Sequence, residues 1–140
     1  MKLRARILVA NGNDDILAAL DEALTHAGYD VKTVHVRAIR LGELDFPALF
    51  REFRPAVAIV DIGPPYQDNW AFAQRLVKHV DSSRVPFLWT TTNARALTEL
   101  TGARVDELLL KPYDLDHLLE KVQRVIAEDG GATLPPMADD

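Results

Sequence analysis

The feature that most constrains the fold is the alternation of short apolar runs with segments of helical periodicity along the chain. Apolar runs at 7–10, 31–36, 56–61, 86–91 and 108–110 predict five buried strands. Helical patterns between and after them predict helices near 14–27, 47–53, 70–80, 94–100 and 115–129. Strands that alternate with helices indicate a parallel sheet covered on both faces, the doubly wound α/β class.

Turn and capping residues bound these elements. The pair Asn11-Gly12 ends the first strand, and Asp14 or Asp15 is the expected N-cap of the first helix. Two successive prolines after Gly63 require a loop, since proline lacks the N–H that a sheet interior needs. Asp114 is the expected cap of the last helix.

Length and composition fit one soluble domain. We expect the domain to span 1–129 and 130–140 to be a flexible tail, in a chain of 140 residues with 48% hydrophobic and 26% charged residues. A net charge of −5 argues against a nucleic-acid-binding surface. The absence of cysteine excludes disulfides and thiolate chemistry, and the first apolar run is too short for a signal peptide or a membrane span. The expected location is therefore cytoplasmic.

Candidate functional residues follow from the sheet. In parallel α/β sheets, ligands bind outside the carboxyl ends of the strands. The residues at those ends are Asn11, Gly12, Asp61, Thr91 and Lys111. The four histidines, at 26, 35, 79 and 117, have no metal-ligand spacing and are expected at the surface. Trp89 is expected in the core, and Trp70 could border the site.

Two segments, VAIVDIGPPYQDNW and LLLKPYDLDHLLEKV, resemble the receiver domain family of response regulators. The resemblance covers nearly the whole chain and implies a flavodoxin-like strand order. It implies that Asp61, with Pro65 four residues on, is the phosphoacceptor, and that Thr91 and Lys111 contact the phosphoryl group. It also implies a cis bond between Lys111 and Pro112.

The chemistry of phosphoryl transfer explains these residue types. A carboxylate forms an acyl phosphate when fixed positive charges neutralise the transferring group. Lys111 would supply one charge and Thr91 a hydroxyl donor. Backbone N–H groups after Asp61 could complete the site.

The sequence departs from its family at the metal site. Receivers carry two adjacent acidic residues after the first strand, and the matching positions here are Asn11 and Gly12. Because Mg²⁺ prefers charged oxygen ligands, we expect its binding by Asp61 and the Gly63 backbone to be weak or absent. Leu108 replaces the usual switch aromatic, and Asn69 stands where the family generally has glycine.

The leading functional hypothesis is a stand-alone receiver-like module of two-component signal transduction, with no enzymatic activity, that acts through protein–protein interaction. Its expected partner is a sensor histidine kinase or another signalling protein, with no nucleic acid and no membrane. The face over 94–128 is a candidate partner or homodimer surface. One alternative is a conventional response regulator phosphorylated at Asp61. Another is a small nucleotide- or flavin-binding enzyme on the same fold, although the chain lacks a glycine-rich phosphate loop.

Overall fold

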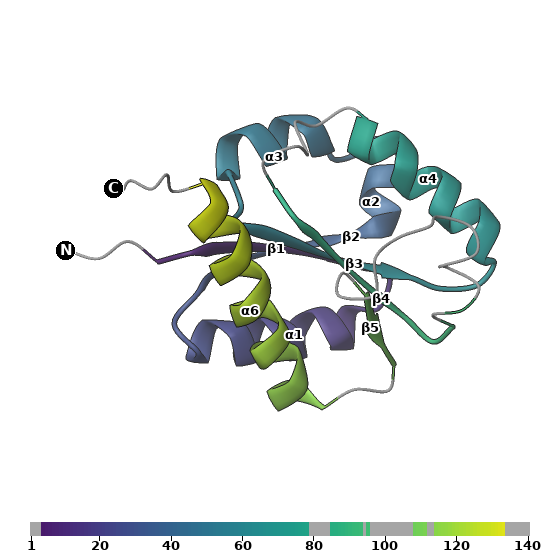
Figure 1. Cartoon of the computed structure of the whole chain (residues 1–140). Coiled ribbons are helices and arrows are strands. Elements are labelled where there is room, and N and C mark those ends of the chain that lie inside the picture. The colour runs from purple at the N-terminus through teal and green to yellow at the C-terminus, as the bar shows by residue number, and fades with distance from the viewer. Residues whose placement is uncertain (1–3, 79–84, 94, 96–107, 112–113, 134–140) are drawn as a thin grey trace.

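Five parallel strands form one sheet in the order β2-β1-β3-β4-β5 in the computed structural model (Figure 1). The structure describes residues 4–78, 85–93, 95, 108–111 and 114–133. The strands are β1 (Arg6–Asn11), β2 (Asp30–His35), β3 (Val57–Ile62), β4 (Phe87–Thr91) and β5 (Leu108–Leu110). The described helices are α1 (Asp14–His26), α2 (Val36–Arg40), α3 (Phe46–Phe53), α4 (Tyr66–Lys78) and α6 (Leu115–Thr133). The predicted parallel α/β sheet is confirmed.

Successive side chains along the central strands point to opposite faces of the sheet, so each strand contributes to two separate cores. On one face, α1 and α6 pack over alternate residues of β1 and β3, which include Ile7, Val9 and Ile59. On the other face, α2, α3 and α4 cover the intervening residues, such as Leu8 and Val60. Figure 1 shows these two layers of helices on either side of the sheet. Burial on both faces explains why β1 and β3 are continuous apolar runs.

The structure corrects the predicted start of the first helix. Asn13 is the N-cap of α1, and its side chain accepts hydrogen bonds from the backbone N–H groups of Asp15 and Ile16 at 2.9 and 3.1 Å. Asp14 and Asp15 lie inside the first turn, where a carboxylate interacts favourably with the helix dipole but does not cap the helix. The prediction that Asp14 or Asp15 caps the helix was therefore wrong by one or two positions.

The second strand ends earlier than predicted, because a short helix follows it. Val36, expected in the strand, is the first residue of α2. The side chain of His35 caps this helix, since its Nδ1 accepts a hydrogen bond from the Arg37 backbone N–H at 3.0 Å. This local bond offers the backbone an alternative to the strand. The apolar pattern at 31–36 gave no sign of it.

The later elements also differ from their predicted bounds. The fourth helix begins at Tyr66, directly after the proline loop, and not at Trp70. The last helix extends to Thr133, past the expected domain boundary at 129. Asp114 caps it as predicted, accepting from the His117 backbone N–H at 2.7 Å. Apart from Arg95, which is helical, the helix predicted at 94–100 lies outside the described residues, as do residues 134–140 of the expected tail.

Within the described part of the chain, no helix is both long enough and apolar enough to cross a membrane. A cis peptide bond joins Pro64 to Pro65 in the loop after β3. The cis bond implied between Lys111 and Pro112 cannot be placed, because Pro112 lies outside the described residues.

Candidate functional site

The carboxyl ends of the strands bring the predicted polar residues to one edge of the sheet. Asp61 is the penultimate residue of β3, and Asn11 is the last residue of β1. Lys111 directly follows β5, and its backbone N–H donates to the carbonyl of Thr91 at 2.6 Å. This bond continues the pairing of β4 with β5 and fixes the position of Lys111.

Asp61 is held by two side chains, Thr90 of the adjacent strand β4 and Lys111, which follows β5. Nζ of Lys111 lies 2.9 Å from Oδ1 of Asp61, and Oγ1 of Thr90 donates to the same oxygen at 2.7 Å. The Asp61 and Lys111 side chains are only 15% and 24% exposed. Both of these bonds end on Oδ1, and Oδ2 of Asp61 accepts no hydrogen bond from any described residue. That oxygen is therefore the one available as a nucleophile.

The hydroxyl beside Asp61 belongs to Thr90, a residue that the sequence analysis missed. Asp61 is in register with Thr90, and in a parallel pair the residues in register point to the same face. Thr91 is fully buried on the opposite face, and its Oγ1 accepts from the Asn93 backbone N–H at 3.2 Å. Sequence pattern could not choose between two adjacent threonines, and a phosphate contact by Thr91 stays a prediction.

The two residues at the positions of the acidic pair, Asn11 and Gly12, are uncharged. Asn11 is 4% exposed, and its Oδ1 accepts from the backbone N–H of Asn13 at 3.0 Å. That amide oxygen therefore shapes the turn into α1. Gly12 is exposed, and a Cβ built on it would meet no atom within 4 Å. A side chain would thus fit at Gly12.

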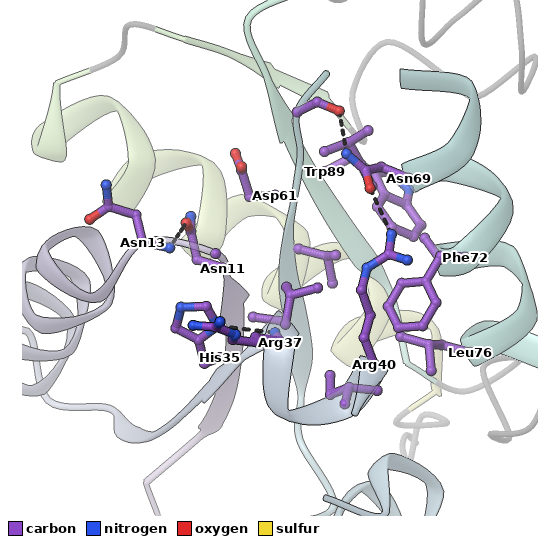
Figure 2. Close-up of a pocket in the computed structure, with 18 of the residues that line it drawn as sticks. Asn11, Asn13, His35, Arg37, Arg40, Asp61, Asn69, Phe72, Leu76 and Trp89 are labelled. Carbon is purple, nitrogen blue, oxygen red and sulfur yellow. Dashed lines mark hydrogen bonds between the residues drawn. The ribbon is translucent and has the colours of Figure 1, made fainter. Parts of the chain in front are cut away.

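The loop after Asp61 is tied to α2 and α4 by polar contacts. Asn69 donates through Nδ2 to the Gly63 carbonyl at 2.7 Å and accepts through Oδ1 from Nη2 of Arg40 at 2.7 Å. The guanidinium of Arg40 also lies 4.0 Å from the ring centroid of Phe72. Figure 2 shows this chain of contacts on one wall of the site. The sequence marked Asn69 only as a departure from the family, and nothing in it pointed to Arg40.

The donor set is a poor match for Mg²⁺. The candidate ligands are the Asp61 carboxylate, the Gly63 carbonyl and the Asn11 amide oxygen, and each already accepts a hydrogen bond. Only one of the three is charged, whereas Mg²⁺ favours carboxylates in near-octahedral geometry. Among the described residues, no group of three or more His, Asp or Glu could hold a metal ion.

A pocket of about 490 Å³ opens beside Asp61 and continues between α2 and α4. Its mouth is polar, with Asn11, His35, Arg37, Asp61 and Lys111, and its inner walls are apolar. Asp61 is the only acidic residue among the described residues that line it. In Figure 2, His35 and Arg37 lie on one side of the pocket and the Arg40–Asn69 wall on the other.

Other predicted residues are placed only in part. Leu108 lies on β5 in register with Trp89. Residues 94, 96–107 and 112–113 of the candidate interaction surface over 94–128 lie outside the described residues. Trp89 is buried at 6% exposure, as predicted, and Trp70 packs edge-on against it with ring centroids 4.8 Å apart.

No family model matches the chain. Protein PilH of Pseudomonas aeruginosa is 28% identical over 125 residues, which cover 88% of this chain and 98% of that protein. The probable transcriptional regulator ycf27 of Porphyra purpurea is 26% identical over 125 residues, covering 88% of this chain. The chain spans about half of that relative, 48% of its length.

The fold has solved counterparts. The crystal structure of a response regulator receiver protein from Sinorhizobium medicae superposes with a TM-score of 0.65. Its sequence is 22% identical, and the match covers 90% of this chain and 97% of that one. At this level of sequence identity, the similarity shows a shared fold and nothing more.

Proposed function

We propose that this chain, which has the receiver fold and is related in sequence to response regulators, binds a signalling protein in a manner independent of phosphorylation at Asp61. The relation to two-component signalling rests on the relatives. The further step that we propose is that this binding does not depend on phosphorylation of Asp61. The proposed activity is binding, with no catalysed reaction.

The observation that carries this proposal is the isolation of Asp61 as the one acidic residue among the described residues of the pocket. An acyl phosphate at Asp61 would carry about two negative charges on its phosphoryl oxygens in place of the single charge of the carboxylate. Among the described residues, the cation that contacts Asp61 and could neutralise this charge is Lys111, with Nζ 2.9 Å from Oδ1. Without a metal held by further carboxylates, the phosphorylated state would be poorly stabilised.

The hydroxyl and switch positions also support the proposal. A ligand or modification shifts a conformational equilibrium only by its differential interaction with the two states. In this structure, Thr91 is buried on the face away from Asp61, and Leu108 offers no hydroxyl-bearing ring that could change exposure. A phosphoryl group on Asp61 would therefore have little differential interaction with two conformations through either the Thr91 hydroxyl or the side chain at position 108.

A conventional response regulator phosphorylated at Asp61 is the second candidate. It is favoured by Oδ2 of Asp61, which accepts no hydrogen bond among the described residues, and by Lys111 at 2.9 Å from Oδ1. This arrangement keeps a carboxylate oxygen free beside a cation, as a phosphoacceptor requires.

The two candidates differ in how partner affinity responds to a phosphodonor. We expect acetyl phosphate to change the affinity for a sensor histidine kinase or other partner by less than about threefold, roughly 0.7 kcal/mol of coupling. The measurement compares wild type with Asp61→Ala, each with and without donor. A tenfold donor effect in wild type that is absent in Asp61→Ala would establish the conventional switch.

A positive control comes from restoring the acidic pair. The double variant Asn11→Asp with Gly12→Asp should accept a phosphoryl group from acetyl phosphate and Mg²⁺, detected as a mass increase in intact-protein mass spectrometry. Wild type should show little or none. Full modification of wild type under the same conditions would contradict the proposal.

A further inference from the structure

The inner part of the pocket, away from Asp61, has the features of a small-molecule site. It runs over the sheet face at Val60 and Trp89, under α2 and against Phe72 and Leu76 of α4. Its volume of about 490 Å³ lies within the range of roughly 300–1,000 Å³ that is typical of ligand sites. Apolar walls with few polar groups at one end are also typical of such sites.

The polar groups at the mouth favour a negative charge. The lining holds Arg37, Arg40 and Lys111 against the single carboxylate of Asp61, and Lys111 pairs with that carboxylate. The Arg40 guanidinium is engaged by Asn69 and by the Phe72 ring. Basic side chains therefore outnumber acidic ones among the described lining residues, and Asp14, which lies outside the lining, is 3.7 Å from Nε2 of His35.

Of the three basic side chains that line the mouth, Arg37 is the one whose guanidinium has no partner among the described residues. Its backbone N–H donates to His35 and its carbonyl accepts from the Leu41 backbone N–H at 2.9 Å. Within the described part of the chain, however, its guanidinium has no hydrogen-bond or ion-pair partner. The buried Asn11 offers a second donor, because Oδ1 is used by Asn13 while Nδ2 has no bond to any described residue. Both side chains line the pocket mouth (Figure 2).

We propose that this pocket binds a small amphipathic anion, a flat apolar ring system carrying one carboxylate or similar group. The ring occupies the space between Phe72 and Trp89, where burial of apolar surface drives binding. The anionic group faces Arg37 and the Asn11 amide, which donate charge-assisted hydrogen bonds. The uncharged residues at positions 11 and 12 make this binding feasible, because two carboxylates there would repel the anion.

The test uses two probes of the same shape, 2-naphthoate and its neutral amide, 2-naphthamide. Isothermal calorimetry gives their affinities, and tryptophan fluorescence reports occupancy because Trp89 lines the pocket. We expect saturable one-to-one binding of the naphthoate, about fivefold tighter than that of the amide, as for a partly exposed charge pair. Absence of saturable naphthoate binding would overturn the inference.

Three variants separate the effect of the Arg37 charge on binding from effects of net charge and of folding. Arg37→Gln should abolish the preference for the anion, whereas Arg51→Gln on α3, an exposed arginine outside the pocket, should leave it unchanged. Equal loss in both variants would show that only the net charge matters. Ala73→Leu, which places a larger side chain in the lining, should weaken both probes while circular dichroism shows an intact fold.

The same probes distinguish this inference from the proposed signalling function. Asp61→Asn removes the phosphoacceptor and the only acidic residue among the described lining residues. Naphthoate affinity should therefore stay unchanged or rise in this variant. A clear fall would place the anion on Asp61–Lys111 rather than on Arg37 and would reject the proposed geometry.

Discussion

Lys111 and Asp61, fifty residues apart in the chain, meet at 2.9 Å across the strand that lies between theirs in the sheet. Thr90 on that intervening strand donates to the same carboxylate oxygen at 2.7 Å. The ends of β3, β4 and β5 are thus joined by side chains as well as by backbone pairing. This contact makes the candidate phosphoacceptor a structural element of the sheet edge.

Asp61→Asn should lower the free energy of unfolding slightly, by about 1 kcal/mol or less. The amide oxygen can still accept from Thr90, but the half-buried Lys111 loses its counter-ion. Urea denaturation measures the change, with Glu22→Gln on the exposed surface of α1 as the matched carboxylate-to-amide control. A clear rise in melting temperature in Asp61→Asn would mean that the carboxylate lies in a repulsive environment.

Magnesium should bind no tighter than roughly tens of millimolar, because the ligand set holds a single carboxylate. A calorimetric titration of wild type checks this. The change Asn11→Asp with Gly12→Asp should tighten binding strongly, and the open space around Gly12 can accept the new side chain. Sub-millimolar affinity in wild type would contradict the reading of the site.

Asn13→Ala should cost about 1 kcal/mol of stability, the usual value for loss of an N-cap. The N–H groups of Asp15 and Ile16 would lose their acceptor. Asn13→Asp retains a capping oxygen and should be nearly neutral. Asp14→Ala, at a side chain that is 86% exposed, should cost clearly less than Asn13→Ala. Chemical denaturation ranks the three, and a larger effect at Asp14 would argue that Asp14 is the cap.

Asn69→Ala should destabilise the protein by about 1–2 kcal/mol, because two hydrogen bonds are lost, one of them to a charged group. Gln74→Ala, an exposed amide on the same helix, is the control and should change little. Hydrogen exchange should show faster exchange of backbone amides in the loop at Gly63. Equal stability of the two variants would mean that the Arg40–Asn69–Gly63 contacts contribute nothing.

The sequence by itself determined the alternation of strands and helices, and with it the parallel sheet. It also determined that Asp61 and Lys111 lie at the same edge of the sheet, because both end buried strands and the carboxyl ends of parallel strands share one edge. Local signals placed the loop at Gly63 and the cap at Asp114, since proline geometry and capping depend on neighbours in the chain.

Only the tertiary structure decided which threonine faces Asp61. Because side chains alternate along a strand, a shift of one residue in register exchanges Thr90 for Thr91, and the register depends on packing across the whole sheet. The Arg40–Asn69 bond spans 29 positions and has no local pattern. The pocket beneath α2 likewise arises from the way helices separated in sequence pack on one face of the sheet, a relation that no window of sequence contains.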